Sequence, residues 1–341
     1  MQPEKCDHRT VTLSCVSAYW GPTLLVTPQT NPEYVAFSNL IIDDILLADG
    51  QSFINTLGGA GTHTVFGMLW WCNSAGFMAA VGEDLSHSHR NTLAAAGVDL
   101  RGLISRPNMP TPRAWQLFDD DERRVEVFRT SLEEFGQQKP VFSEMPSDYI
   151  QARGVHIQWG NPSEQADLIA NLRSQNNKVL VSCEPAMTHH ENNLAENTQV
   201  LKVVDLYSPD RTEAYAITRD TRPRQMVDII LGEGAPVVAL RMGAAGSLVG
   251  TSNGDFFKVP AVPPAALVDV TGAGNAYCGG FLVGLGLGEP VEQAAARAAV
   301  SASFAIEQIG PPQINAAKRD EASQRIQWAL NRIQAINCSD N

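Results

Sequence analysis

Residues 268–280 read VDVTGAGNAYCGG and join a short apolar run to an apolar helix through two closely spaced glycines. We expect a strand to end at 266–268 and a helix to span 275–287. Glycines let backbone N–H groups turn toward a ligand and let an anion approach without a Cβ in its way. The helix N-terminus adds partial positive charge at the same place. The stretch therefore predicts an anion site, although a tight turn that binds nothing has the same composition.

Two common phosphate loops are excluded here. A P-loop has Lys followed by Ser or Thr after its last glycine, whereas Gly274 is followed by Asn275. The dinucleotide pattern G-x-G-x-x-G fails because the next glycine after Gly274 is Gly279. Position 275 also raises a chemical question, since a carboxylate there would accept a proton and an amide does not.

Composition and charge narrow the class of protein. The chain has 341 residues, 44% of them hydrophobic and 18% charged, which is typical of a globular protein. Acidic residues outnumber basic ones by 37 to 25, and this balance argues against nucleic acid and anionic membranes as partners. The polar start, the absence of an apolar run of about 18 residues and six cysteines without C-x-x-C spacing favour a cytoplasmic protein with reduced thiols.

The hydrophobic pattern predicts alternating strands and helices. A run rich in β-branched and apolar residues at 34–47 is expected to be one strand, and 113–129 a hairpin with an acidic tip at 119–122. Further strands are expected at 75–81, 155–159, 179–183, 205–208 and 236–240, and helices at 85–96, 163–174, 193–204, 291–308 and 316–336. This order indicates βαβ units and a parallel sheet, whose ligands bind beyond the carboxyl ends of the strands.

Four motifs then follow in a specific order. Gly58-Gly59-Ala60-Gly61 opens a helix after Asp43-Asp44, and Asp210-Arg-Thr-Glu213 follows a strand. Arg241-Met-Gly243-Ala-Ala-Gly246 and the loop at 269–275 come next. Over about 34–310 the chain resembles the ribokinase-like, or phosphofructokinase-B, family of carbohydrate and nucleoside kinases. It is similar to a divergent, fungal branch in which Asn replaces the usual catalytic Asp.

The resemblance implies an α/β fold with three layers, α/β/α, around a mostly parallel central sheet. A small β lid is expected from about 36–48 and 111–130. The ribokinase-like domain would then cover 34–341 and follow an N-terminal extension at 1–33. Relatives often form dimers through the lid, so a homodimer is expected by analogy.

The resemblance also implies a small polyol substrate. Asp43, at the end of the first strand, would bind its hydroxyls, and Gly58, Gly59 and Asn275 would line the same site. His63 stands where the family has Asn. Two structural interpretations remain beside these roles: an acidic turn at Asp43-Asp44 and a purely structural His63.

ATP and Mg2+ are the implied cofactors. Asp210 and Glu213 match the family's Asn-x-x-Glu motif near the metal, with an additional carboxylate that suits Mg2+. The nucleotide loop would comprise Arg241, Gly243 and Gly246, with Arg241 in place of a hydroxyl residue. Thr271, Gly272 and Gly274 would bind the phosphates.

Catalysis would centre on Gly272, Ala273, Gly274 and Asn275. General-base catalysis contributes roughly 10²–10⁴ in rate, but the loose transition state of phosphoryl transfer needs little nucleophile activation. Asp269 and Asp210 are two carboxylates that could compensate. The sequence thus predicts ATP-dependent phosphoryl transfer to a sugar, nucleoside or related polyol, slow or with a relocated base. The alternatives are a pseudokinase that binds a nucleotide or metabolite, and different chemistry on the same scaffold.

Overall fold

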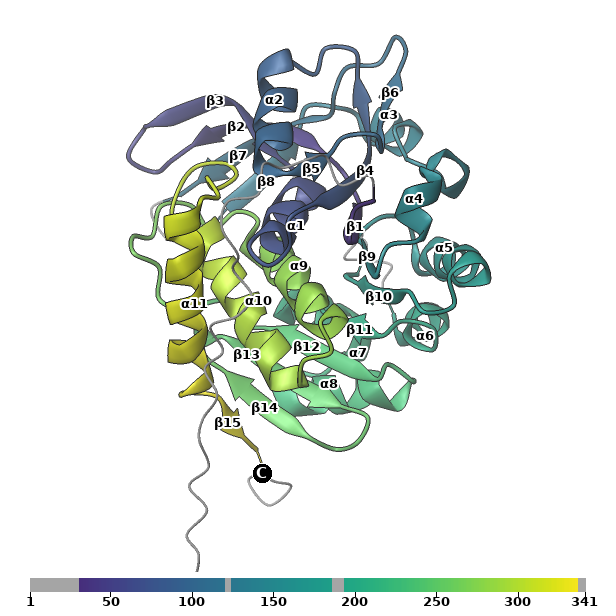
Figure 1. Ribbon diagram of the computed structural model, residues 1–341, viewed down its shortest axis with the longest axis vertical. Helices are drawn as coiled ribbons and strands as arrows, with labels where there is room; N and C mark the ends of the chain where they lie inside the picture. Colours follow the sequence, from purple (N-terminus) through teal and green to yellow (C-terminus); the bar gives the residue numbers. More distant parts are fainter. Residues whose placement is uncertain (1–30, 120–123, 186–192, 337–341) are drawn as a thin grey trace, which may run out of the picture. The chain divides into compact units, whose positions relative to one another are not determined.

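The computed structural model describes residues 31–119, 124–185 and 193–336, which form two β-sheets and their surrounding helices (Figure 1). The central sheet has the strand order β15 (Gln334–Ala335), β14 (Phe256–Val259), β13 (Ser247–Thr251), β12 (Val237–Arg241), β11 (Leu206–Tyr207), β10 (Leu180–Cys183), β9 (Gly154–Ile157), β1 (Tyr34–Phe37), β4 (Ala75–Gly82), β5 (Val98–Asp99). An additional strand, β6 (Leu103–Arg106), pairs with β4. Strands from β12 to β5 are parallel, while β13, β14 and β15 are antiparallel.

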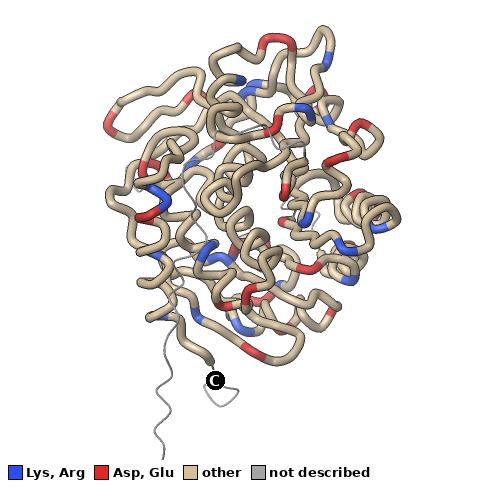
Figure 2. Tube along the Cα trace, viewed as in Figure 1, with Lys and Arg blue, Asp and Glu red and all other residues tan. Residues whose placement is uncertain are grey.

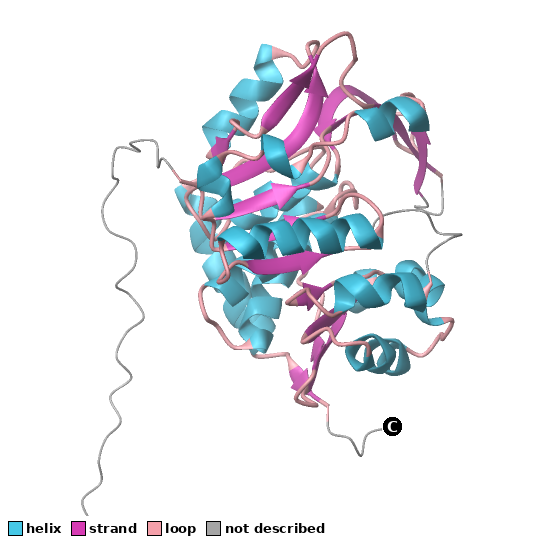
Figure 3. Cartoon of the chain, turned by 90° about the vertical axis from the view of Figure 1, so that its right-hand side faces the viewer, coloured by secondary structure: helices cyan, strands magenta, loops and turns pink. Residues whose placement is uncertain are grey.

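Helices cover both faces of the central sheet (Figure 3). One core contains side chains of α5 (Pro162–Gln175), α6 (Leu194–Leu201), α7 (Arg211–Thr218) and α8 (Pro223–Gly232). The opposite cores contain those of α1 (Ala60–Leu69), α2 (His87–Ala96), α9 (Ala273–Gly286), α10 (Val291–Ala305) and α11 (Ala316–Leu330). Three short helices, α3 (Leu132–Gln137), η1 (Phe142–Glu144) and α4 (Ser147–Ile150), join β8 to β9. The predicted three-layer α/β/α fold with a mostly parallel sheet is confirmed.

Strand β1 shows why the central sheet is buried on both sides. Val35 and Phe37 belong to one core, and Tyr34 and Ala36 belong to the other. Successive side chains of a strand point to opposite faces, so a strand covered by helices on both sides is apolar throughout. All four residues of β1 are buried, as this position in the sheet requires.

A small second sheet has the order β3 (Ser52–Gly58), β2 (Ile41–Leu46), β7 (Arg113–Phe118), β8 (Arg124–Phe128). β7 and β8 form the predicted hairpin, but most of its acidic tip, residues 120–122, lies outside the described residues. The strand expected at 34–47 is wrong, because the chain leaves the central sheet at Ser38 and enters the small sheet at Ile41. Residues 36–37 consequently belong to the central sheet and not to a lid.

Three other expectations need correction. Residues 266–268 form no strand, and Leu267 and Val268 are exposed at 55% and 41%, because the apolar run lies in an irregular surface segment. Helix α9 begins at Ala273, two residues before the expected start at 275. Helix α11 ends at Leu330, since the chain then turns to add β15 to the edge of the central sheet.

The remaining sequence expectations concern charge, cysteines and membranes. Acidic and basic positions are interspersed along the described chain (Figure 2). Cys72, Cys183 and Cys278 are free and buried, while Cys6, Cys15 and Cys338 lie outside the described residues, as does the extension up to residue 30. Among the helices of the described segments, none is both long and apolar enough to cross a bilayer.

Candidate active site

Asp43 lies in β2, on the face of the small sheet that also carries Gln116 of β7. The Asp43 side chain is buried, and its Oδ1 accepts a hydrogen bond from Nε2 of Gln116 at 3.0 Å. A Cβ at Gly58 would lie 1.8 Å from Oδ2 of Asp43, so only glycine leaves room for this carboxylate. Burial, opposed by the Gln116 hydrogen bond, raises the pKa of Asp43 to about 7. The group can therefore bind hydroxyls and change charge near neutral pH.

Asp43 and Asp44 point to opposite faces of β2. Asp44 shares its face with Trp115 and pairs with Arg129. Both carboxylates lie inside a strand, so the interpretation of Asp43-Asp44 as an acidic turn is wrong. Asp43 lies inside β2, the second strand of the chain, so its expected place at the end of the first strand also needs correction.

His63 brings the motif at 58–61 against the loop at 269–275. The side chain lies on α1 and is buried, and a Cβ at Gly272 would lie 2.0 Å from its Cγ. Burial lowers the pKa of His63 to about 4, so the ring is neutral at neutral pH. Gly59, with φ 86°, caps α1 and would place a Cβ 2.6 Å from N of Ile41. Gly59 is thus required by the backbone, whereas His63 touches the predicted anion loop.

The anion loop uses part of its own backbone. The N–H of Thr271 donates to Oδ1 of Asp269 at 2.8 Å, and that of Ala273 to O of Val270 at 3.4 Å. These two amides close the turn and are not directed to a ligand. The amides of Gly274 and Asn275 remain, since the first turn of a helix offers them no intrahelical acceptor. Gly272 is the N-cap residue of α9 and has a left-handed backbone conformation, with φ 75°.

Arg241 lies on the other side of the same loop. A Cβ at Gly274 would lie 2.0 Å from Nη1 of Arg241, so this glycine makes room for a guanidinium of the protein itself. Nη2 of Arg241 is 2.8 Å from Oε2 of Glu184 and 3.1 Å from Oε2 of Glu213. Arg241 is therefore a buried counter-ion in addition to a candidate ligand for phosphate.

One guanidinium faces two carboxylates, and their pKa values move apart. Burial alone would raise the pKa of Glu184, but Arg241 and the hydrogen bonds from His156 and Asn275 lower it below its usual range. Burial raises the pKa of Glu213 to about 8, because the Arg241 charge is countered by nearby Asp210 and Glu184. Arg241 thus makes its shorter ion pair with Glu184, whose lowered pKa keeps it ionised, and its longer one with Glu213.

Asp210 and Glu213 form a capping box at the start of α7. The N–H of Asp210 donates to Oε2 of Glu213 at 2.7 Å, and the N–H of Glu213 donates to Oδ1 of Asp210 at 2.8 Å. Each carboxylate commits one oxygen to the helix. The other two, Oδ2 of Asp210 and Oε1 of Glu213, have no hydrogen-bond partner within the described segments.

The two glycines of the loop after β12 differ in what they require. Gly246, with φ 82°, would place a Cβ 2.0 Å from O of Val259 and is needed for packing against β14. Gly243, with φ 58°, has open space around its Cβ position. Of the two, Gly243 is the one that leaves room for a ligand.

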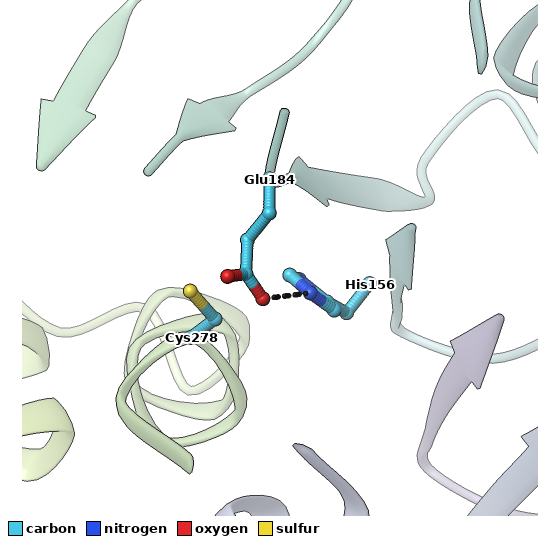
Figure 4. A group of neighbouring side chains, drawn as sticks. All are labelled: His156, Glu184 and Cys278. Atoms are coloured by element: carbon cyan, nitrogen blue, oxygen red, sulfur yellow. Dashed lines mark hydrogen bonds and ion pairs between the residues drawn. The ribbon is translucent and has the colours of Figure 1, made fainter. Parts of the chain in front are cut away.

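The side-chain amide of Asn275 is bound to the protein through its nitrogen. Its Nδ2 donates to Oε1 of Glu184 at 3.0 Å. Figure 4 shows Glu184 between His156 and Cys278, with donor atoms that all lie within 4.8 Å of one another. Although these are metal-ligand types, Glu184 already bonds to His156 and Arg241. A second cation beside the guanidinium would be repelled, so we interpret the group as a buried polar network.

Several buried polar atoms of the site lack partners among the described residues. They are Oε1 of Gln116, Nδ1 of His63, Oγ1 of Thr271 and Nε of Arg241. Buried polar groups are normally hydrogen-bonded, and those that are not call for a ligand or water. His63 and Arg241 contact the anion loop, Thr271 belongs to it and Gln116 bonds to Asp43, so these atoms leave hydrogen-bonding capacity for a ligand at the site.

Sequence reasoning missed Glu184, His156 and Gln116. Glu184 directly follows β10, and a charged residue after a buried strand is the signal that pointed to the other motifs. His156 and Gln116 sit inside strands, where alternation alone does not separate a functional side chain from a structural one.

The sequence pattern of pfkB family carbohydrate kinases matches residues 31–316 of this chain. A cytidine kinase from Thermococcus kodakarensis is 26% identical over 266 residues, which are 76% of this chain and 91% of that protein. A nucleoside kinase from Methanothermobacter thermautotrophicus is 28% identical over 257 residues, covering 74% and 79%. A putative ribokinase II from E. coli, solved with ATP and Mg2+, superimposes with a TM-score of 0.70 at 19% identity, covering 86% and 99%.

The fold, the ordered motifs and the family match agree. This chain belongs to the pfkB family of carbohydrate kinases.

Proposed function

We propose that this protein is an ATP-dependent kinase that phosphorylates a hydroxyl of a nucleoside. The observation that carries the proposal is the position of the loop at 271–275, with His63 against Gly272 and Arg241 against Gly274. One short loop therefore contacts both His63, on the side expected to bind the polyol, and Arg241, on the side of the ion pairs with Glu184 and Glu213. The names of the similar cytidine and nucleoside kinases favour a nucleoside over a free sugar.

The residues present fit a phosphate group and Mg2+. Oγ1 of Thr271 and Nε of Arg241 are buried donors without partners among the described residues, and both suit an anion. The free oxygens of Asp210 and Glu213 are hard donors, which suit Mg2+ directly or through its waters, and binding of the cation would release the proton that burial favours on Glu213. Mg2+ in that place would supply neutralisation of the phosphate charge.

The acceptor side favours a ligand rich in hydrogen-bond donors. Nε2 of Gln116 is committed to Asp43 and to Glu126, at 3.0 and 2.8 Å, so only its Oε1 is left. Asp43, Glu126 and this Oε1 are all acceptors. Hydroxyls of a ribose, or an amino group of a base, would satisfy them.

In this mechanism Asp43 holds the substrate, and the amides of Gly274 and Asn275 stabilise the transferred group. Before transfer Asn275 accepts the hydrogen bond of the attacking hydroxyl but does not take its proton; as the new O–P bond forms and the bond to ADP breaks, this proton passes to a carboxylate. Asp210 is committed to the capping box, whereas Asp269 keeps Oδ2 without a partner in the described chain. The charge of Asp269 is felt at Asp43 and adds to the rise of the Asp43 pKa. Asp269 is therefore the better candidate for the relocated base.

The test is ADP release from Mg-ATP with cytidine, uridine, inosine or ribose as acceptor, for the native protein and for Asp269→Asn. We expect turnover with a nucleoside and a loss of roughly tenfold or more in kcat for the variant. Thermal stabilisation by Mg-ATP without ADP release for any acceptor would overturn the proposed turnover and favour a pseudokinase.

We also propose a homodimer through the outer face of the small sheet. Leu46, Ile54, Trp115, Val125 and Val127 are exposed there at 44%, 68%, 45%, 57% and 37%. Apolar strands at the surface pair readily with a second copy. Sedimentation should show a dimer for the native chain and a monomer for Ile54→Asp; a native monomer would refute it.

A further inference from the structure

Glu184 stands at the centre of the polar network behind the anion loop. Its side chain is 3% exposed. Oε1 lies 3.0 Å from Nε2 of His156 and receives Nδ2 of Asn275 at the same distance, while Oε2 lies 2.8 Å from Nη2 of Arg241. Its backbone O accepts Nε2 of Gln165 at 3.1 Å, so main chain and side chain are both fixed.

This environment determines which way the Asn275 amide points. A carboxylate paired with a guanidinium is ionised and accepts hydrogen bonds only. The nitrogen of Asn275 must therefore face Glu184, and Oδ1 takes the opposite direction. Within the described chain Oδ1 has no hydrogen-bond partner, so a hydroxyl of a ligand can donate to it.

We propose that Glu184 is a positioning residue of the phosphoryl-transfer site, which holds Asn275 so that its Oδ1 receives the attacking hydroxyl. We further propose that positions 184 and 275 are a matched pair in which only one member carries negative charge. The inference rests on the proposed kinase function for its catalytic part. The charge pairing itself can be tested without any substrate.

The matched pair explains why the acid at 275 cannot simply be restored. In Asn275→Asp a second carboxylate would lie about 3 Å from buried Glu184, and two carboxylates at such a distance do not both ionise. The new Asp would then be protonated at neutral pH, or the loop would be pushed aside. In both cases no base is gained.

Neutralising Glu184 removes the conflict. In Glu184→Gln, Oε1 can face Arg241 while Nε2 donates to an aspartate at 275. His156 can adopt the other tautomer, because Nδ1 contacts Oγ of Ser182 at 2.9 Å and a hydroxyl can donate or accept. The double variant Glu184→Gln/Asn275→Asp should thus hold an ionised aspartate where the family usually has one.

The activity test compares four proteins: native, Asn275→Asp, Glu184→Gln and the double variant, with cytidine and Mg-ATP. We expect lower kcat for Asn275→Asp, and for Glu184→Gln a lower kcat with little change in KM, as for a positioning residue. The double variant should exceed Asn275→Asp by about tenfold or more and show a new acidic limb in its pH–rate profile. A kcat for Asn275→Asp alone that is as high as that of the double variant would overturn the proposal.

The second readout is thermal unfolding without ligand at pH 8 and pH 5. Asn275→Asp should lower Tm by about 5 °C at pH 8, less at pH 5, where a proton relieves the repulsion, and little in the Glu184→Gln background. Asn315→Asp, the same exchange at the N-cap of α11, serves as the control without a change in Tm. Equal Tm losses in both backgrounds would refute the pairing, whereas absent ADP release with intact coupling would refute only the kinase function.

Discussion

A carboxylic acid is buried on each side of the anion loop, and the two differ in how the cost of burying a charge is met. On the side of the small sheet, buried Asp43 has no ion pair with a described residue, and its pKa is raised to about 7 although the charge of Arg124 partly opposes the rise. On the side of α7, Glu184 is equally buried, but Arg241 and two further donors lower its pKa. Burial is common to both carboxylates, so the counter-ion decides their charge.

The difference separates groups that stabilise the protein from groups reserved for a ligand. Glu184 has its hydrogen bonds satisfied within the chain and contributes to the folded state. On the other side, buried atoms of Gln116 and His63 lack hydrogen-bond partners in the described chain, and burial disfavours the charged form of Asp43. Both features cost stability in the free protein. A substrate that fills this side would relieve that cost. The following predictions test this division.

The largest effect is expected from Arg241→Met, which leaves Glu184 buried without its cation. Breaking a buried ion pair costs about 3–5 kcal/mol, measurable by urea unfolding at pH 7. Because Arg241 depresses the folded-state pKa of Glu184, its stabilisation is present above the unfolded pKa of about 4.3 and is lost as pH falls further. The deficit of the variant should therefore shrink in acid.

The control for Arg241→Met is Arg222→Met. Arg222 pairs with Asp220 but its side chain is 73% exposed, so its removal should leave the unfolding midpoint unchanged. Equal losses for the two variants would mean that the Arg241 cluster does not stabilise the protein.

The next effect concerns Asp43→Asn, which should lower kcat/KM by roughly 10²-fold or more, because an amide replaces the carboxylate that binds hydroxyls. Stability should move the other way. The raised pKa of Asp43 costs stability progressively as pH rises from about 4 to about 7, so Tm of the variant should exceed that of the native protein at pH 8 and not at pH 4.

Asp44→Asn is the matched control for this prediction, since Asp44 is the adjacent residue on the opposite face, paired with Arg129. Its kcat/KM should stay at the native value. If both variants lost activity alike, the loss would come from a disturbance of β2 and not from the missing carboxylate of Asp43.

A smaller effect is expected from Gly272→Ala. Alanine in the left-handed region costs roughly 1–2 kcal/mol, and here its Cβ would also lie 2.0 Å from Cγ of His63. Gly254→Ala, with φ 90° and open space around it, isolates the backbone cost. Urea unfolding should show a larger loss for Gly272→Ala, and equal losses would contradict the contact with His63.

The sequence predicted the features that leave a local mark. Strands alternating with helices predicted the parallel sheet, and the glycine clusters before two helices marked Gly58, Gly59 and Gly272 as special positions. Each of these residues is required by a contact that any larger side chain would block. The glycine clusters are visible in the sequence, although the contacts themselves join distant positions: Gly58 with Asp43, Gly59 with Ile41 and Gly272 with His63.

Features that depend on distant partners were not predictable. The run at 34–47 is rich in apolar residues, and the polar pair Ser38-Asn39 inside it does not by itself reveal that the chain passes there from one sheet to another. The ion pair of Arg241 with Glu184 joins the ends of β12 and β10, and Asn275 reaches it from α9. No spacing rule relates these positions. The same holds for the contact of Gln116 with Asp43, which is set by strand register.

The smallest effect on stability is expected from Thr271→Val. Oγ1 of Thr271 is buried and without a partner in the described chain, so its loss should change the free energy of unfolding by less than about 0.5 kcal/mol. Ser208→Ala is the contrast: its Oγ donates to O of Ala239 at 3.0 Å, and it should lose about 1 kcal/mol. With Mg-ATP the order reverses, because Thr271→Val should bind roughly tenfold more weakly, as measured by thermal shift against nucleotide concentration. A stability loss for Thr271→Val as large as that for Ser208→Ala, with unchanged Mg-ATP affinity, would show that the hydroxyl serves the fold and not a phosphate.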